Sequence, residues 1–214
     1  MPRPQCPRCQ RPASHCLCPL IPSLTSATQV LVLQHPSEAA HALNTARLAT
    51  LGLRNAELVV GETVNLPIDE RANYLLFPGV DAIPLERLTT TERPLRLIVP
   101  DGTWRKARRM LHLNPVLATL PRVSLPTGLV SRYRLRKAPA PGALSTIEAI
   151  VTALNILEGE GRFDGLLRPF EAMIEAQIAA MGLDVYQRNH GRGEAVEGNS
   201  AGGERLQTND IDAD

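Results

Sequence analysis

Four cysteines lie within the first eighteen residues and have the spacing of a metal-binding cluster. Cys6-x-x-Cys9 is followed after six residues by Cys16-x-Cys18. Two close pairs of thiols can surround a tetrahedral zinc ion without help from the rest of the fold. One alternative is a pair of disulfides, which a reducing compartment disfavours. The other is four unrelated free thiols, which the close clustering disfavours. The sequence therefore predicts a structural zinc site.

A second group of reactive side chains follows an apolar segment in the middle of the chain. Residues 97–99 have the composition of a strand covered on both faces, and the Pro-Asp-Gly sequence at 100–102 ends it. Trp104, the only tryptophan, follows at once. Because sites in open α/β sheets gather at the carboxyl ends of strands, Asp101 is a candidate acid or base. The alternative is that Asp101 only caps the next helix.

His35 has an equivalent position at the end of another predicted strand, where Pro36, Ser37 and Glu38 follow it. A histidine here can serve a site or can be an ordinary hydrogen-bonded loop residue. Ser37 is a natural N-cap for the helical pattern that continues to Gly52.

Arginines gather in two places that suit a phosphate backbone. On a helix predicted at residues 104–113, Arg105 and Arg109 lie one turn apart. From residue 129 to 136 the side chains alternate, which puts three arginines on one side and an aromatic residue on the other, namely Arg132, Arg134, Arg136 and Tyr133. Arginines can bind RNA phosphates and an aromatic ring can stack on a base. A solvated surface is the alternative for both groups.

Short apolar segments that alternate with helical patterns predict an α/β domain to hold these residues. Its sheet is mostly parallel and carries helices on both faces. Strands are expected at residues 28–34, 56–60, 74–77, 97–99 and 122–125. Helices are expected from Ser37 to Gly52, at 104–113, from the capping box of Ser145 and Glu148 to residue 157, and at 166–181.

Composition and length limit the remaining organisation. A chain of 214 residues forms one core with small appendages, so the expected parts are a zinc module at 1–22, a main domain at 23–186 and a disordered tail at 187–214. The tail has three arginines against six acidic residues, which leaves the folded part with a charge of +4. No apolar segment has the length of a membrane helix and no signal peptide is visible, so we expect a cytoplasmic protein without a membrane partner. The absence of GxGxxG and Walker sequences disfavours a standard dinucleotide or ATP site.

Several short motifs occur together in one order. They are the cysteine cluster with Arg8, His35-Pro36-x-Glu38, Asp101-x-Thr103-Trp104 and Ser145-Thr146-x-Glu148-Ala149. This combination resembles the DTW domain family over nearly the whole chain except the acidic tail. The resemblance implies a tRNA-uridine aminocarboxypropyltransferase that transfers the 3-amino-3-carboxypropyl group of S-adenosylmethionine to N3 of uridine 47 and releases methylthioadenosine. It also implies a relationship to SPOUT methyltransferases, whose parallel sheet carries a C-terminal trefoil knot; knots are rare exceptions to the usual topology rules.

The resemblance also implies roles for particular residues. Asp101, with Thr103 and Trp104, forms the catalytic group, in which Trp104 stacks on uracil or adenine or else only fills the space between helix and sheet. Cofactor-binding loops are expected at Pro78, Gly79, Leu125, Pro126, Gly128, Leu144, Ser145, Thr146 and Glu148. Contacts to tRNA are expected from His35, Arg105, Arg109, Arg132, Tyr133, Arg134 and Arg136. A SPOUT-type RNA methyltransferase and a non-catalytic zinc-containing RNA-binding module remain alternatives, and a monomer is expected with a homodimer left open.

Overall fold

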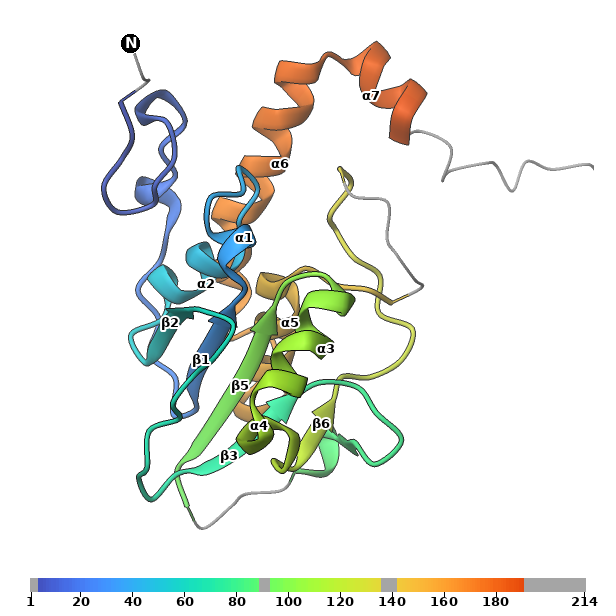
Figure 1. The fold of residues 1–214 in the computed structure, drawn as a ribbon. Coiled ribbons are helices and arrows are strands. Elements are labelled where there is room, and N and C mark those ends of the chain that lie inside the picture. The colour runs from blue at the N-terminus through green and yellow to red at the C-terminus, as the bar shows by residue number, and fades with distance from the viewer. Residues whose placement is uncertain (1–3, 89–92, 136–141, 191–214) are drawn as a thin grey trace, which may run out of the picture.

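A six-stranded parallel sheet forms the centre of the protein, with strand order β2-β1-β5-β3-β6-β4 (Figure 1). The computed structural model describes residues 4–88, 93–135 and 142–190. The strands are β1 (Gln29–Gln34), β2 (Ala56–Val60), β3 (Ala72–Leu76), β4 (Ile83–Pro84), β5 (Leu95–Asp101) and β6 (Arg122–Ser124). The predicted parallel α/β architecture is confirmed, whereas the trefoil knot stays a prediction.

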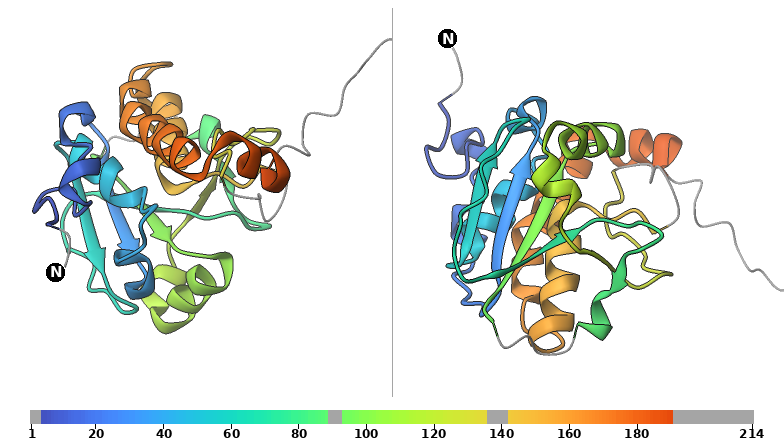
Figure 2. Two further views of the ribbon diagram at one scale, coloured as in Figure 1. Left: turned by 90° about the horizontal axis from the view of Figure 1, so that it is seen from above. Right: turned by 60° about the horizontal axis from the view of Figure 1, so that its bottom comes forward.

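Helices cover both faces of this sheet (Figure 2). One face carries α3 (Trp104–Leu113) and α4 (Pro115–Ala118), and the other carries α2 (Ala46–Gly52), α5 (Thr146–Glu158) and α6 (Leu167–Met181). Alternate residues of β1 serve the two layers: Leu31 and Leu33 pack towards α3, whereas Val30 and Val32 belong to the core under α5 and α6. This two-sided burial explains the continuous apolar composition of the central strands.

The central strand β5 is longer than the sequence predicts. It begins at Leu95 and continues through Pro100 to Asp101, because Pro100 lies opposite Leu33 and Asp101 lies opposite Gln34 of β1. Arg96 near its start is 1% exposed, and its guanidinium donates to Gln29 Oε1 at 2.6 Å, to Asn73 Oδ1 at 3.0 Å and to Asp69. This buried network connects β1, β5 and β3 at the end opposite the site described below.

The helix predicted between Ser37 and Gly52 is wrong, because the chain forms two short helices here, α1 (Pro36–Ala39) and α2. Asn44 lies in the break. Its Nδ2 donates to the Glu38 carbonyl at 3.2 Å, and its Oδ1 accepts from Arg47 N–H at 3.1 Å. The side chain therefore completes the end of one helix and the start of the next, which the alanine periodicity does not reveal. His35 is the N-cap of α1 in place of the predicted Ser37.

Two further elements differ from the expected boundaries. The edge strand β4 has only two residues, too few for any periodicity to show. After Gly182 the chain forms α7 (Leu183–His190), so helical structure continues past residue 186, where the tail was expected to begin. No helix among the described residues is long and apolar enough to span a membrane.

Candidate functional site

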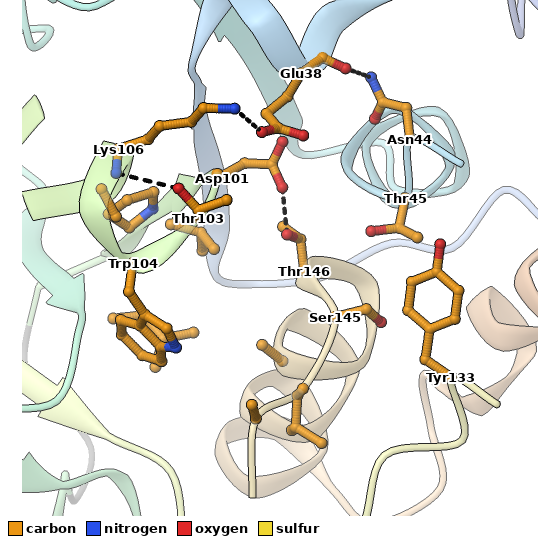
Figure 3. Close-up of a pocket in the computed structure, with 18 of the residues that line it drawn as sticks. Glu38, Asn44, Thr45, Asp101, Thr103, Trp104, Lys106, Tyr133, Ser145 and Thr146 are labelled. Atoms are coloured by element: carbon orange, nitrogen blue, oxygen red, sulfur yellow. Dashed lines mark hydrogen bonds and ion pairs between the residues drawn. The ribbon is translucent and has the colours of Figure 1, made fainter. Parts of the chain in front are cut away.

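A pocket of 570 Å³ lies at the carboxyl ends of the parallel strands (Figure 3). Its described walls lie at or after the ends of four strands: residues 38–45 after β1, 76–78 at β3, 99–107 at β5, and 133–135 with 143–149 after β6. The volume is in the range of small-molecule and cofactor sites, and this end of an open sheet is where such sites form.

The carboxylate of Asp101 is 9% exposed and is held from two directions within this pocket. Gln34 Nε2 of β1 donates to Oδ2 at 2.7 Å, and the Thr146 hydroxyl at the start of α5 donates to Oδ1. The N-cap of α3 is Thr103, whose hydroxyl accepts from Lys106 N–H at 3.4 Å. The alternative that Asp101 is the cap of this helix is therefore wrong, and Asp101 lines the pocket.

Gln34 and Asn44 support this arrangement, and sequence reasoning missed both. Gln34 is fully buried, and its amide exchanges hydrogen bonds of 3.2 and 3.3 Å with the Asn44 amide. A polar residue at the end of an otherwise apolar strand was the available signal.

Glu38 and Lys106 form an ion pair in the pocket wall (Figure 3). Lys106 Nζ donates to Glu38 Oε1 at 2.6 Å. The Lys106 side chain is 26% exposed and the Glu38 side chain is 22% exposed. The sequence marks Glu38 only as part of a motif, and nothing in its spacing pairs this residue with Lys106, 68 positions away.

Trp104 stands at the rim of the pocket and is 41% exposed. Its ring meets Phe77 edge to face, with the centroids 5.5 Å apart, and the Arg122 guanidinium lies 5.9 Å from the Phe77 centroid. The tryptophan is therefore supported from one side but is not a buried plug between helix and sheet.

The predicted cofactor-binding residues divide into two groups. The pocket is lined by Pro78, Leu144, Ser145 and Thr146, whereas Gly79, Leu125, Pro126, Gly128 and Glu148 lie outside its lining. Gly79 lies against Arg122 instead, since a Cβ at this position would be 3.1 Å from the guanidinium.

Glu148 serves the fold rather than the pocket, which corrects its predicted cofactor role. It is 5% exposed and forms the predicted capping box with Ser145, whose backbone N–H donates at 2.8 Å. Its carboxylate also accepts from Ser131 Oγ at 2.9 Å and from the Arg132 backbone N–H at 2.6 Å. These bonds attach the chain after β6 to the start of α5.

The alternation predicted after residue 129 is present, although the segment joins no strand. Arg132 and Arg134 are exposed and pair with Glu171, at 2.8 Å, and with Glu175 of α6. Tyr133 faces inward, where it is 9% exposed, meets Phe170 edge to face and lines the pocket. Its stacking on an RNA base stays a prediction. Arg136 lies outside the described residues.

Outside the pocket lining, Glu62 pairs with two residues that were predicted to contact RNA. Its carboxylate accepts from His35 Nε2 and from Arg109 Nε, each at 3.0 Å. The hydrogen bond from His35 and the positive charge of Arg109 both lower the pKa of Glu62 from its ordinary value. His35 Nδ1 accepts from Ser37 N–H at 3.2 Å. His35 is thus a hydrogen-bonded histidine at a helix start, while Arg105 is exposed on α3.

The N-terminal cysteines form a cluster that fits a zinc ion. The sulfur atoms of Cys6, Cys9, Cys16 and Cys18 all lie within 4.8 Å of one another, and two pairs are 3.6 and 3.8 Å apart. Tetrahedral zinc–thiolate bonds of about 2.3 Å place sulfurs about 3.8 Å apart. Backbone N–H groups of Cys9 and Arg8 lower the pKa of Cys6 to about 6, whereas burial raises the pKa of Cys18 to about 12.

Known proteins similar to this chain share one family. The DTW domain matches residues 3–178. A Drosophila melanogaster tRNA-uridine aminocarboxypropyltransferase 2 is 32% identical over 190 residues, which are 82% of this chain and 76% of that protein. The Mus musculus protein of the same name is 32% identical over 82% of this chain and 64% of its own length, and Arabidopsis thaliana tRNA-uridine aminocarboxypropyltransferase A is 29% identical over 73% of each. No solved structure matches significantly.

Proposed function

This chain belongs to the DTW domain family, and we propose that it transfers the 3-amino-3-carboxypropyl group of S-adenosylmethionine to N3 of a tRNA uridine. The names of its relatives support the reaction class. The single observation that carries the proposal is the position of Asp101, a carboxylate fixed by Gln34 and Thr146 inside a pocket of cofactor size. Uridine 47 is the substrate position expected from the resemblance.

The pocket has the chemistry that this donor requires. Apolar side chains of Leu76, Phe77 and Leu144 suit an adenosine moiety, and the carboxylates of Glu38 and Asp101 suit a cationic ligand. When bound, S-adenosylmethionine supplies a carbon atom activated by the adjacent sulfonium.

Asp101 takes the proton that uridine N3 loses. Formation of the N3–carbon bond breaks the carbon–sulfur bond and leaves methylthioadenosine, so one proton must leave the base during the transfer. A carboxylate held in one orientation accepts that proton more effectively than a mobile one. Gln34 and Thr146 are the positioning residues for this step.

Trp104 and Thr103 form the binding position for the uracil base. The exposed Trp104 ring at the rim offers a surface on which a uracil turned out of its stack can lie. Thr103 caps α3, so it positions Trp104 and Lys106 at the first turn of the helix.

The remaining charged groups bind the rest of the substrate and the metal. Arg105, Arg109, Arg132 and Arg134 would contact tRNA phosphates. Cys6, Cys9, Cys16 and Cys18 would hold a structural zinc ion, which the sulfur distances support.

The test is incubation of the full chain with S-adenosylmethionine and unmodified tRNA, followed by mass analysis of nucleosides and small molecules. We expect equal amounts of aminocarboxypropyl-uridine and methylthioadenosine. Methylated RNA with S-adenosylhomocysteine would instead establish the methyltransferase alternative. Binding of tRNA without either product would contradict the proposal in favour of a non-catalytic module.

A further inference from the structure

We propose that Glu38 and Lys106 form the receptor for the amino and carboxylate groups of the transferred moiety, and so determine which S-adenosyl compounds the pocket accepts. Glu38 accepts from the α-ammonium, and Lys106 donates to the α-carboxylate. This inference rests on the proposed function and assigns particular side chains to the amino-acid part of the ligand.

The location of the pair is the first argument. Glu38 lies on α1 beyond the end of β1, and Lys106 lies on the first turn of α3 beyond the end of β5, yet both line the pocket that holds Asp101 (Figure 3). Their charged atoms are 2.6 Å apart and the side chains are only 22–26% exposed. The pair is therefore within reach of a ligand that occupies the pocket.

Charge complementarity is the second argument. The titratable groups of the described pocket wall are Glu38, His41, Asp101, Lys106 and Tyr133. The two carboxylates and one ammonium in this set sum to a charge of −1. S-adenosylmethionine carries a sulfonium, an ammonium and a carboxylate, so its charge is +1. The opposite charges favour this ligand over neutral adenosine derivatives.

The third argument concerns what happens to the ion pair when a ligand enters. A zwitterion brings one group of each sign, so Glu38 and Lys106 can each gain a new partner and neither charge is left uncompensated. A ligand that lacks the ammonium leaves Glu38 without a ligand partner, and one that lacks the carboxylate does the same to Lys106. Polar sites reject analogues in this way, because a charged group in a partly dehydrated site then has no ligand partner. Asp101 is already fixed by Gln34 and Thr146, which leaves it for the base.

The experiment measures binding of four compounds to the full chain by calorimetry. S-adenosylmethionine and S-adenosylhomocysteine carry both groups, decarboxylated S-adenosylmethionine carries only the ammonium, and methylthioadenosine carries neither. We expect Lys106→Met to weaken binding of the first two by about ten- to hundredfold, without weakening binding of the last two. We expect Glu38→Gln to weaken binding of the three ammonium compounds and to leave methylthioadenosine unchanged.

A matched control variant and the binding of methylthioadenosine distinguish a specific loss of ligand contacts from general damage to the pocket. Arg108→Met removes a neighbouring exposed cation of α3 that does not line the pocket, and should change none of the four affinities. Equal weakening of all four compounds by Lys106→Met or Glu38→Gln would overturn the inference, as would unchanged discrimination in both variants. If wild-type protein binds none of the four, the proposed function itself fails, which is a different result.

Discussion

At the scale of single residues, the position of Asp101 depends on side chains from two elements that are far apart in the chain. Gln34 of β1 and Thr146 of α5 donate to its two oxygens. Thr103, not Asp101, completes the first turn of α3. Asp101 is therefore not the N-cap of α3, and its carboxylate lines the pocket.

Asp101→Asn should lower the rate of methylthioadenosine formation by about 10²- to 10⁴-fold, because the amide keeps the shape of the side chain but cannot accept the N3 proton. Single-turnover measurements with saturating tRNA give the rate directly, and thermal unfolding provides the control for folding. Thr146→Val should give a smaller loss, since Gln34 still holds the carboxylate. An Asp101→Asn variant with the wild-type rate would exclude Asp101 as the base.

The sequence motifs identified residues with reactive side chains in the pocket better than the residues that hold those side chains in position. Asp101, Trp104 and Thr146 were named from the sequence and all line one cavity. Gln34, Asn44 and the Glu38–Lys106 pair were missed as parts of the site because their roles come from contacts between segments distant in sequence. The same limit applies to Tyr133, whose inward orientation depends on the position of Phe170.

At the scale of elements, the parallel sheet could be predicted because its strands are short apolar segments separated by helical patterns. Placement of the site at the carboxyl ends followed from that topology. The failure between Ser37 and Gly52 has a local cause, since Asn44 replaces backbone hydrogen bonds and so permits a break that alanine spacing conceals. Glu148 shows the reverse case, because its capping box with Ser145 was predicted correctly from local spacing, although its bonds to Ser131 and Arg132 were not.

Glu148→Ala should destabilise the protein by about 2–3 kcal/mol, because four donors lose a buried charged acceptor: Ser145 N–H, Ser145 Oγ, Ser131 Oγ and Arg132 N–H. Chemical denaturation measures the change in the free energy of unfolding. Glu148→Gln keeps one acceptor oxygen and should lose less. Because the carboxylate lies outside the pocket lining, the affinity of the folded variant for S-adenosylmethionine should remain near wild type; a large selective loss would return Glu148 to the cofactor site.

At the scale of the whole molecule, the cysteine cluster connects to the pocket through one arginine. Arg11 Nη2, within the cluster, donates to the Ala42 carbonyl at 2.6 Å, in the turn between α1 and α2. Residues on both sides of Ala42 line the pocket. The N-terminal segment also lies beside α6, so its loss would expose part of that helix (Figure 1).

Removal of zinc should therefore weaken S-adenosylmethionine binding as well as destabilise the N-terminal segment. We expect one zinc per chain by elemental analysis under reducing conditions, and lower zinc affinity as the pH falls, because protons compete for the thiolates. Cys9→Ser should lose zinc and bind the donor less tightly. Arg11→Met should retain zinc but show a similar loss of donor affinity. Protein purified with no zinc and full donor affinity would contradict this connection.

The arginines beside α6 are expected to bind the phosphates of tRNA. Arg132 and Arg134 pair with Glu171 and Glu175 on the surface, where such ion pairs contribute little because solvent screens them. Phosphates can therefore displace the glutamates. Replacing both arginines by glutamine should weaken tRNA binding and reduce the slope of log affinity against log salt by about one per arginine.

Replacing Glu171 and Glu175 by glutamine should strengthen tRNA binding, because the arginines no longer exchange one anionic partner for another. Fluorescence anisotropy with labelled tRNA across a salt series measures both effects. Arg71→Gln is a control on a different surface, since its guanidinium pairs with Asp69. If the double arginine variant keeps the wild-type salt slope, tRNA phosphates do not bind along α6, and the exposed arginines of α3 become the surface to test.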